Sequence, residues 1–429
     1  MPVSKHYTLI CQVCRKEFTD NGYRLGCDEN HEPGLLLTNY TLKQFEVQRD
    51  REDIYRYQQW LPIQRTLEGT RKAVVYQSKS LSRMTRLSSL WIAFSGYWPA
   101  KSAMGGTTTF KDLEAPTVLS RIPLTHKEVL VVASAGNTAA AFAFACSQCC
   151  LPCVIILPES GIERMQFRDS LHPCVKIVVL TGFVDYYDAI MLANRVASHA
   201  GFILEGGVHN VARRDGLGTI LCSAVEMMGR LPDYYFQAIG SGAGGIAVHD
   251  TAKKLLCDGR FGQQYPRLML SQNSPFTPIY HSWKAQQRSL IEVDQNDGKK
   301  QIRQIAAQVL SNQRPPYSVR GGVFDALQES QGDMLVATNH EVSHAMALFR
   351  EAEGIDIDPA AGVAFATLLK QAAAGSIEPD AHVLLNITGG GWIQRSHDYQ
   401  LVPAQPTLEI KEHELSLQHT VERIVQVAE

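Results

Sequence analysis

The sequence predicts an α/β protein made of two three-layer α/β/α domains with a cleft between them. Three observations lead to this prediction. Apolar runs of strand length alternate with segments of helix length from about residue 128 onward, as in parallel βαβ units covered on both faces. The chain of 429 residues is long enough for two or three domains. Three predicted strands also run directly into small polar residues.

The first part of the alternation covers residues 128–207. Continuous apolar runs predict four strands, and the three segments between consecutive strands predict helices. In chain order we expect a strand at 128–135, a helix at 138–149, a strand at 153–158, a helix at 161–171, a strand at 174–180, a helix at 185–200 and a strand at 201–207.

The second part resumes with a helix at 215–230 and strands beginning at 233 and 267. Residues 273–333 contain several prolines and charged residues, which predicts loops and short helices over a cleft. A helix follows, because Thr338 and Glu341 have the spacing of a capping box and Gly354 supplies a stop. The run "AHVLLNITGGG" predicts a last buried strand that ends in three glycines.

These elements suggest a division of the chain. We expect a cysteine-containing N-terminal extension at 1–45 and a larger domain from 46–125 and 206–400. A smaller α/β domain is expected at 126–205. The polar residues 401–429 are expected to form a C-terminal surface appendage.

Composition and charge exclude several partners. The net charge is −2 with no long basic run, so we expect no nucleic-acid partner. The N-terminus lacks the apolar core of a signal peptide, and Asn137, Gln148 and Pro152 interrupt the most apolar stretch, so no membrane partner is expected. Ten cysteines without an export signal indicate a reducing, cytoplasmic location. We also expect a homo-oligomer.

Two groups of cysteines have spacings that resemble metal sites. In "CSQCCLPC" the first three thiols fall on an apolar helix, so we interpret them as core residues. Near the N-terminus, Cys11 and Cys14 form a C-x-x-C, and Cys27 precedes His31. This set could close a small zinc ribbon. The C-x3-H half departs from the usual spacing, however, and the sequence by itself assigns no metal ligand.

The first polar strand end is "VVASAGNTAAA". Its turn lies between a strand and a helix, so backbone amides should converge at a helix N-terminus and form an anion site suited to a carboxylate. Ser134 and Thr138 are the candidate substrate-binding residues there, and Asn137 can offer its amide to a hydroxyl. The alternative is that Ser, Gly and Asn are ordinary turn and cap residues.

The second strand end is glycine-rich and opens a helix, which suits a phosphate group. Its residues are Gly240, Ser241, Gly242, Ala243, Gly244 and Gly245. The spacing also satisfies G-x-G-x-x-G, so a dinucleotide is an alternative. The acidic residue expected to bind its ribose is missing, because the next strand ends in Ser271 and Gln272.

The third strand end places Thr388 beside three glycines. A hydroxyl at this position could bond a heterocyclic nitrogen. As an alternative, the glycines serve only close backbone packing.

Lys111 lies in "GGTTTFKDLEA", where Thr109 and Asp112 have the spacing of a capping box. An ammonium in the first turn faces the positive end of the helix dipole, at a cost of roughly 0.3–1 kcal/mol if exposed. Either the side chain extends into solvent, or its amine is poorly stabilised as a cation so that it reacts as a nucleophile.

In their order along the chain, the lysine, the Ser-Ala-Gly-Asn turn, the glycine-rich loop and the Thr-Gly-Gly end resemble the fold-type-II pyridoxal 5'-phosphate (PLP) enzymes. This family includes tryptophan synthase β, threonine synthase and the O-acetylserine sulfhydrylases. The resemblance covers about residues 90–395. It implies that Lys111 binds the cofactor covalently, that Asn137 contacts its ring hydroxyl, and that residues 240–244 hold its phosphate. Thr388 would face the pyridine nitrogen, and this neutral partner would favour elimination and replacement at Cβ.

Differences between this sequence and particular members of the family indicate which substrate it uses. Threonine synthases usually continue the lysine motif as F-K-D-R, whereas Leu113 and Glu114 follow Asp112 here. The stretches "FKDLEAP", "YRLGCDENHEPGLL", "SQNSPFTPIYHSW" and "YSVRGGVFDAL" resemble a branch that serves coenzyme M biosynthesis in methanogenic archaea.

That resemblance implies O-phospho-L-serine and sulfite as substrates, giving L-cysteate and phosphate. These anions need local positive charge, for which the candidates are Arg213, Arg214, His281, Lys284 and, as first choice, Arg320. Threonine synthase activity on O-phosphohomoserine, a non-catalytic PLP-binding protein and an NAD-dependent dehydrogenase are the alternatives.

Overall fold

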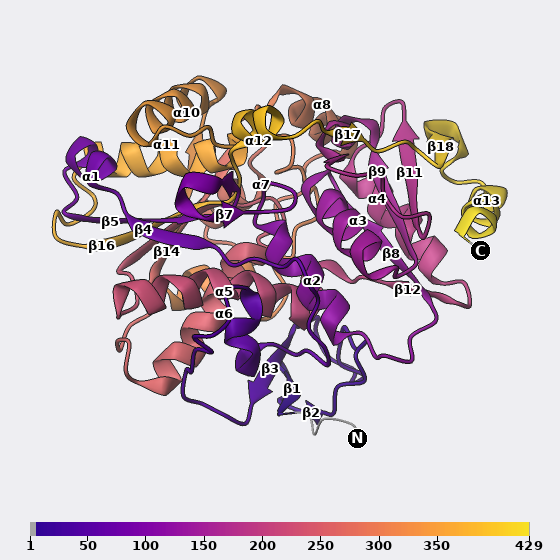
Figure 1. The fold of residues 1–429 in the computed structure, drawn as a ribbon, viewed down its shortest axis with the longest axis horizontal. Helices are drawn as coiled ribbons and strands as arrows, with labels where there is room; N and C mark the ends of the chain where they lie inside the picture. Colours follow the sequence, from indigo (N-terminus) through magenta and orange to yellow (C-terminus); the bar gives the residue numbers. More distant parts are fainter. Residues whose placement is uncertain (1–5, 429) are drawn as a thin grey trace.

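Two sheets organise the computed structural model, which describes residues 6–428 (Figure 1). The larger sheet has six strands, which are parallel except that the edge strand β4 runs antiparallel to β5. In spatial order they are β15 (Asp333–Ala337), β14 (Arg267–Asn273), β13 (Tyr234–Ala238), β16 (His382–Ile387), β5 (Ser89–Phe94) and β4 (Val74–Gln77).

The smaller sheet has five parallel strands. In spatial order they are β12 (Phe202–Leu204), β8 (Val129–Ala133), β9 (Cys153–Pro158), β11 (Val175–Thr181) and β18 (Leu408–Lys411). Residues 126–205 therefore supply the first four, and the last comes from the C-terminal segment.

Helices cover both faces of each sheet, as the alternating sequence predicts. On the larger sheet, α10 (Asn339–Glu353) and α11 (Pro359–Ala373) cover one face, and α5 (Val211–Met228) and α6 (Ala243–Asp258) cover the other (Figure 1).

On the smaller sheet, α2 (Lys111–Arg121) and α3 (Asn137–Cys149) lie on one face. The other face carries α4 (Tyr186–Ala197) and α13 (Gln418–Ala428). Among residues 6–428, no helix combines the length and the apolar character needed to cross a membrane.

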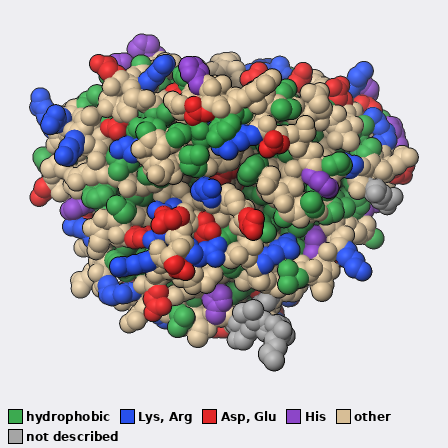
Figure 2. Space-filling view, viewed as in Figure 1, with side chains coloured by type: hydrophobic (Ala, Val, Ile, Leu, Met, Phe, Trp, Pro, Cys, Tyr) green, Lys and Arg blue, Asp and Glu red, His purple; other side chains and the backbone are tan. Residues whose placement is uncertain are grey.

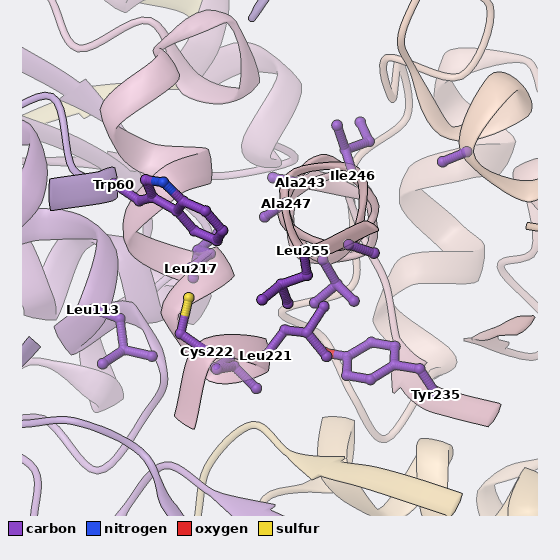
Figure 3. Packing of buried hydrophobic residues seen from close by; sticks show 14 of the residues in the cluster. Trp60, Leu113, Leu217, Leu221, Cys222, Tyr235, Ala243, Ile246, Ala247 and Leu255 are labelled. Carbon is purple, nitrogen blue, oxygen red and sulfur yellow. The ribbon is translucent and has the colours of Figure 1, made fainter. Parts of the chain in front are cut away.

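The contact between α5 and α6 forms the centre of the largest apolar core. Leu217, Leu221 and Cys222 of α5 belong to one cluster of buried side chains with Ala243 and Ala247 of α6 (Figure 3). Gly218 of α5 lets the two helices approach closely, because a side chain there would overlap Thr251 of α6, and this contact sets the relative position of the two helices and of their N-termini. Both N-termini border the site described below.

A small antiparallel sheet precedes these layers, with β1 (Tyr7–Cys11) between β2 (Glu17–Phe18) and β3 (Leu36–Tyr40). It lies beside α2, α5 and α6 at the lower edge of the molecule in Figure 1. Thr38 and Tyr40 of β3 donate hydrogen bonds to the buried Asp215 of α5, at 2.7 and 2.6 Å. The extension is therefore attached to the main core. On the face drawn in Figure 2, acidic and basic side chains are intermixed.

Three local predictions differ from the structure. Residues 161–171 do not form a helix, because a 3-10 turn at Glu159–Arg164 leads into β10 (Gln166–Phe167), which pairs with β17 (Val402–Pro403). The helix expected at 215–230 begins at Val211, where Asn210 caps it. The third difference concerns the C-terminal segment.

Residues 401–429 were expected to form a surface appendage, and the structure contradicts this expectation. β18 pairs in parallel with β11 as the edge strand of the smaller sheet. Ile410 is fully buried, and Val421 and Ile424 of α13 pack in the core beside α4. The few apolar residues of this segment are spaced to fill one face, which its overall polarity hides.

Candidate active site

Most of the predicted site residues line one cavity. It lies where the carboxyl ends of β8, β13 and β16 come together, as expected for ligand sites of open parallel sheets. The predicted residues that line it are Lys111, Ser134, Asn137, Thr138, Gly240, Ser241, Gly242, Ala243, Gly244 and Thr388.

The turn between β8 and α3 lines this cavity. The Oγ atom of Ser134 accepts hydrogen bonds from the amides of Gly136 at 3.0 Å and Ala139 at 2.8 Å, so it caps the helix. Asn137 is the first residue of α3. Its Oδ1 atom is buried and has no hydrogen-bond partner among the described residues. A buried acceptor without a partner costs free energy unless a ligand satisfies it.

The glycine-rich turn between β13 and α6 forms a second helix N-terminus at the cavity. Gly242 has φ +84°, a left-handed conformation that favours glycine, and a side chain there would overlap Val323. At Gly244 a side chain would overlap Gln237. The turn therefore needs glycine to expose its backbone amides, a cradle suited to an anion.

Thr388 follows β16 and is held beside the lysine loop by the backbone. The amide of Phe110 donates to the carbonyl of Thr388 at 2.9 Å, and the amide of Gly390 donates to the carbonyl of Thr108 at 3.1 Å. At Gly391, φ is +81° and a side chain would overlap Tyr97. The glycines after Thr388 thus serve close backbone packing, which fixes the hydroxyl relative to Lys111.

The predicted capping box at the start of α2 is absent. Phe110 occupies the N-cap position without a side-chain bond. The carboxylate of Asp112 instead accepts from the amide and the hydroxyl of Thr107, at 2.9 and 2.6 Å. These bonds tighten the loop before the helix, so Lys111 is held at its first residue.

The amine of Lys111 contacts the carboxylate of Glu114, which lies one turn further along α2. Its Nζ atom lies 2.9 Å from Oε2 of Glu114, and the side chain is 15% exposed. Oε1 of the fully buried Glu114 lies 3.1 Å from Nη1 of Arg213 and accepts from the hydroxyl of Thr138 at 2.8 Å. Arg213 in turn pairs with Glu205, its Nε donating at 2.9 Å. Two cations and two carboxylates therefore form one buried cluster at the cavity wall.

Burial and charge act in opposite directions on this cluster. Burial lowers the pKa of Lys111, although Glu114 partly opposes this effect. Burial alone would raise the pKa of Glu114, but the adjacent Arg213 and Lys111 outweigh it and hold that pKa below its usual range. The amine at the cavity is thus easier to deprotonate than an ordinary lysine, beside a carboxylate that stays ionised.

Arg320, the preferred substrate residue, does not reach the cavity. Its side chain is 43% exposed and its Nε atom lies 2.8 Å from Glu32. Lys284 pairs with Asp333 at the surface, and the buried Arg214 pairs with Asp250 behind α5. Of the five cations proposed for substrate binding, Arg213 is the one that lines the cavity. The prediction for Arg320 was wrong because its local Gly-Gly context gives no information about the facing segment.

Sequence reasoning missed several side chains at or beside the site, among them Glu114 and Tyr186. Glu114 directly follows Leu113, the residue at which the lysine motif departs from F-K-D-R, and this neighbouring departure was the available signal. Tyr186, the first residue of α4, also lines the cavity, and burial raises its pKa to about 12. No local pattern distinguishes it from the neighbouring Tyr187.

Comparisons with known proteins agree with this geometry. A profile of the family described as pyridoxal-phosphate dependent enzyme matches residues 101–389. A cysteate synthase from Methanosarcina mazei is 41% identical over 412 residues, which cover 96% of this chain and 98% of that protein. A cysteate synthase from Methanocella paludicola is 42% identical over 421 residues, or 97% of each chain. The chain belongs to the cysteate synthase family of PLP-dependent enzymes.

The fold-type-II prediction is confirmed by solved structures. Maize serine racemase superposes with a TM-score of 0.58 at 16% identity, covering 76% of this chain and 91% of that chain. The diaminopropionate ammonia lyase from Escherichia coli gives 0.58 at 16% identity, covering 79% and 89%. At such low identity the likeness concerns the fold alone. The family assignment confirms that the chain is an enzyme that uses PLP.

The cavity fits this cofactor by its own chemistry. It offers an amine of lowered pKa at Lys111, an unpartnered buried acceptor at Asn137, an anion cradle at 240–244 and a neutral hydroxyl at Thr388. An aldehyde, a ring hydroxyl, a phosphate and a ring nitrogen are the complementary groups of PLP.

Proposed function

We propose that this chain is a cysteate synthase, which converts O-phospho-L-serine and sulfite to L-cysteate and phosphate. One observation carries the proposal at the level of the site: the amine of Lys111 lies at a cavity bounded by the N-termini of α3 and α6. A reactive amine between two anion-binding helix ends suits a phosphorylated amino acid bound next to a phosphorylated cofactor.

In this proposal the cofactor is held by the residues that fit it. Lys111 binds its aldehyde, Asn137 bonds its ring hydroxyl, Thr388 faces its ring nitrogen, and the turn of Gly240, Ser241, Gly242, Ala243 and Gly244 binds its phosphate. When bound, PLP withdraws electrons from Cα of the amino acid and so permits exchange of the group on Cβ.

The N-terminus of α3 binds the carboxylate of the amino acid. Its amides are free of intrahelical partners, as at any helix start, and the helix dipole favours an anion. Ser134 rigidifies this turn through its two backbone bonds, and Thr138 bonds Glu114. Both side chains position the substrate-binding backbone and the reactive amine. Arg213, held between two carboxylates, lines the cavity and is the guanidinium that we assign to the leaving phosphate and to sulfite.

Lys111 moves the proton at Cα. An amine whose pKa is lowered by burial is neutral in a larger fraction of molecules near neutral pH, so it can accept that proton and later return it. Glu114 fixes the direction of the amine through their 2.9 Å contact. Phosphate then departs from Cβ with the oxygen of the original substrate, and sulfite sulfur forms the new bond to Cβ.

Leu113 favours phosphoserine over O-phosphohomoserine. It occupies the position where threonine synthases usually carry an arginine, and it is 3% exposed and packed in the apolar core beside α5. The chain therefore lacks that cation for the longer phosphorylated substrate.

The test is a spectroscopic and kinetic assay of the purified holoenzyme. We expect a yellow protein whose absorption band shifts when O-phospho-L-serine is added. Sulfite should then yield L-cysteate and phosphate in equal amounts. Borohydride reduction and peptide mapping should find the pyridoxyl adduct on Lys111.

Matched substrates and variants sharpen this test. O-phosphohomoserine should give no threonine, and K111A should give no adduct. Turnover of O-phosphohomoserine that does not depend on sulfite would replace the proposal with threonine synthase. A coloured protein that converts neither substrate would indicate a non-catalytic PLP-binding protein.

A further inference from the structure

Three thiols and one imidazole meet at the N-terminal sheet, away from the cofactor cavity. Cys11 ends β1, Cys14 lies in the turn toward β2, and Cys27 and His31 lie in the following loop. Their ligand atoms all lie within 4.8 Å of one another. All ten cysteines of the chain have free thiols, so the cluster is a set of reduced ligand atoms.

Two distances within the cluster are close to the edges of a zinc tetrahedron. Zn–S bonds of about 2.3 Å and Zn–N bonds of about 2.0 Å imply ligand separations of roughly 3.8 Å for two sulfurs and 3.6 Å for sulfur and nitrogen. Sγ of Cys14 lies 3.6 Å from Sγ of Cys27, and Sγ of Cys11 lies 3.4 Å from Nε2 of His31. A disulfide needs an S–S distance of about 2.05 Å. The sulfurs of Cys14 and Cys27 are too far apart for this bond, and their separation suits two ligands of one ion.

The surrounding backbone orients these ligands. The Nδ1 atom of His31 lies 2.6 Å from the carbonyl oxygen of Glu32. Because a carbonyl can only accept, Nδ1 carries the proton and the lone pair of Nε2 points toward the thiols. The amides of Val13 and Glu29 donate to the sulfurs of Cys11 and Cys27, at 3.4 and 3.5 Å. Such bonds stabilise thiolate charge.

We propose that Cys11, Cys14, Cys27 and His31 bind one structural Zn²⁺. Four protein ligands complete a tetrahedron and leave no open position for a substrate, which distinguishes a structural from a catalytic zinc site. The unusual C-x3-H spacing is no obstacle, because the loop folds back so that His31 reaches Cys11 rather than continuing the run from Cys27.

The ion would fix a segment that has little core of its own. β2 has only two residues, and the loop that carries Cys27 and His31 contains no strand or helix. This loop docks on the larger domain through Arg320, whose backbone pairs with Pro33 and Leu35 at 3.0 and 2.9 Å and whose side chain meets Glu32. These contacts give Arg320 the structural role of a docking partner for the loop.

The first experiment measures metal in the holoenzyme purified under reducing conditions without chelator. We expect about one zinc per chain, and cobalt exchange should give the charge-transfer and visible bands of a tetrahedral thiolate site. C14S and the double variant C14S/C27S should lose the bound zinc. C150S and C257S, which alter exposed cysteines outside the cluster, should keep it.

The proposal is overturned if reduced holoenzyme dialysed against zinc and then desalted holds no stoichiometric metal, or if C14S/C27S retains it. A Cys14–Cys27 disulfide in protein isolated under reducing conditions would also overturn it. Cobalt spectra of the unaltered chain keep the test decisive should a cysteine variant fail to fold. Because metal content is measured without substrates, its outcome is independent of the proposed reaction.

Discussion

The two ends of helix α2 both carry buried charge, but the charges are arranged differently. At the first turn, Lys111 borders the cavity and pairs with the buried Glu114, and the lysine side chain is 15% exposed. At the last residue, Arg121 is fully buried. Its Nε and Nη2 atoms donate to the carboxylate of Asp20 at 3.0 and 2.8 Å, and its Nη1 donates to Asn210 at 2.9 Å.

The difference lies in how completely the groups are paired and what faces them. Asp20 also accepts from Tyr7 at 2.7 Å and from the amide of Gly22 at 3.0 Å, so the Arg121 end is a closed network. At the Lys111 end, the cluster opens onto a cavity that contains the unpartnered Oδ1 of Asn137. A satisfied buried network specifies structure, whereas partly unsatisfied groups at a cavity are suited to a ligand.

The largest expected effect belongs to the open end. K111A should reduce the rate of L-cysteate formation by about 10³-fold or more, because both cofactor attachment and proton transfer are lost. The variant should remain folded, since Arg213 and Thr138 still bond Glu114. Steady-state kinetics with urea unfolding checks both expectations. A K111A variant that is strongly destabilised against urea but retains its turnover would reverse the comparison.

The closed end should respond in stability instead. D20N leaves the buried guanidinium of Arg121 without its carboxylate, which should lower the free energy of unfolding by about 3–5 kcal/mol. Turnover per folded molecule should stay near that of the parent. Urea denaturation and active-site titration measure the two quantities. A normal unfolding midpoint with lost turnover would show that Asp20 acts on the chemistry.

Asp20 also predicts a pH dependence of stability. Burial would raise its pKa, but the hydrogen bonds from Arg121 outweigh burial and lower it. Its contribution is therefore fully present above the unfolded-state pKa of about 3.9 and is lost as the pH falls through the lower folded-state value. We expect D20N to remove part of the acid destabilisation. Unfolding free energies of the parent and of D20N, measured between pH 7 and pH 3, test this expectation. Parallel curves for the two proteins would contradict it.

A smaller effect is expected inside the Lys111 cluster. Glu114 raises the pKa of Lys111 against the stronger lowering by burial, and Glu205 acts in the same direction but less. E114Q should therefore lower this pKa further, so that the apoenzyme recombines with PLP at lower pH. E205Q should shift the midpoint less. The rate of colour recovery against pH measures both, and an upward shift in E114Q would contradict the assigned geometry.

The smallest effect is expected at a surface pair. Lys284 lies 2.6 Å from Asp333, and their side chains are 42% and 34% exposed. K284A should change the free energy of unfolding by less than about 1 kcal/mol, because solvent screens such pairs, and should leave the KM for O-phospho-L-serine unchanged. A several-fold rise in KM would return Lys284 to the list of substrate residues.

Local sequence determined the parts of the site that follow strand ends. The turns at 134–138 and 240–244, as well as Thr388, each come directly after a buried apolar run. Carboxyl ends of parallel strands share one edge of a sheet, so their convergence follows from connectivity alone. The predictions of α/β class, alternating elements and the fold-type-II likeness succeeded for this reason.

Only the tertiary structure decided which charges meet. Glu114 and Arg213 are 99 positions apart, and Asp20 and Arg121 are 101 positions apart; nothing in their local patterns pairs them. The same holds for Arg320, which meets Glu32, and for β18, which completes a sheet begun more than 200 residues earlier. Short-range propensity and periodicity fix elements and their ends, whereas the pairing of buried ions depends on how those elements pack.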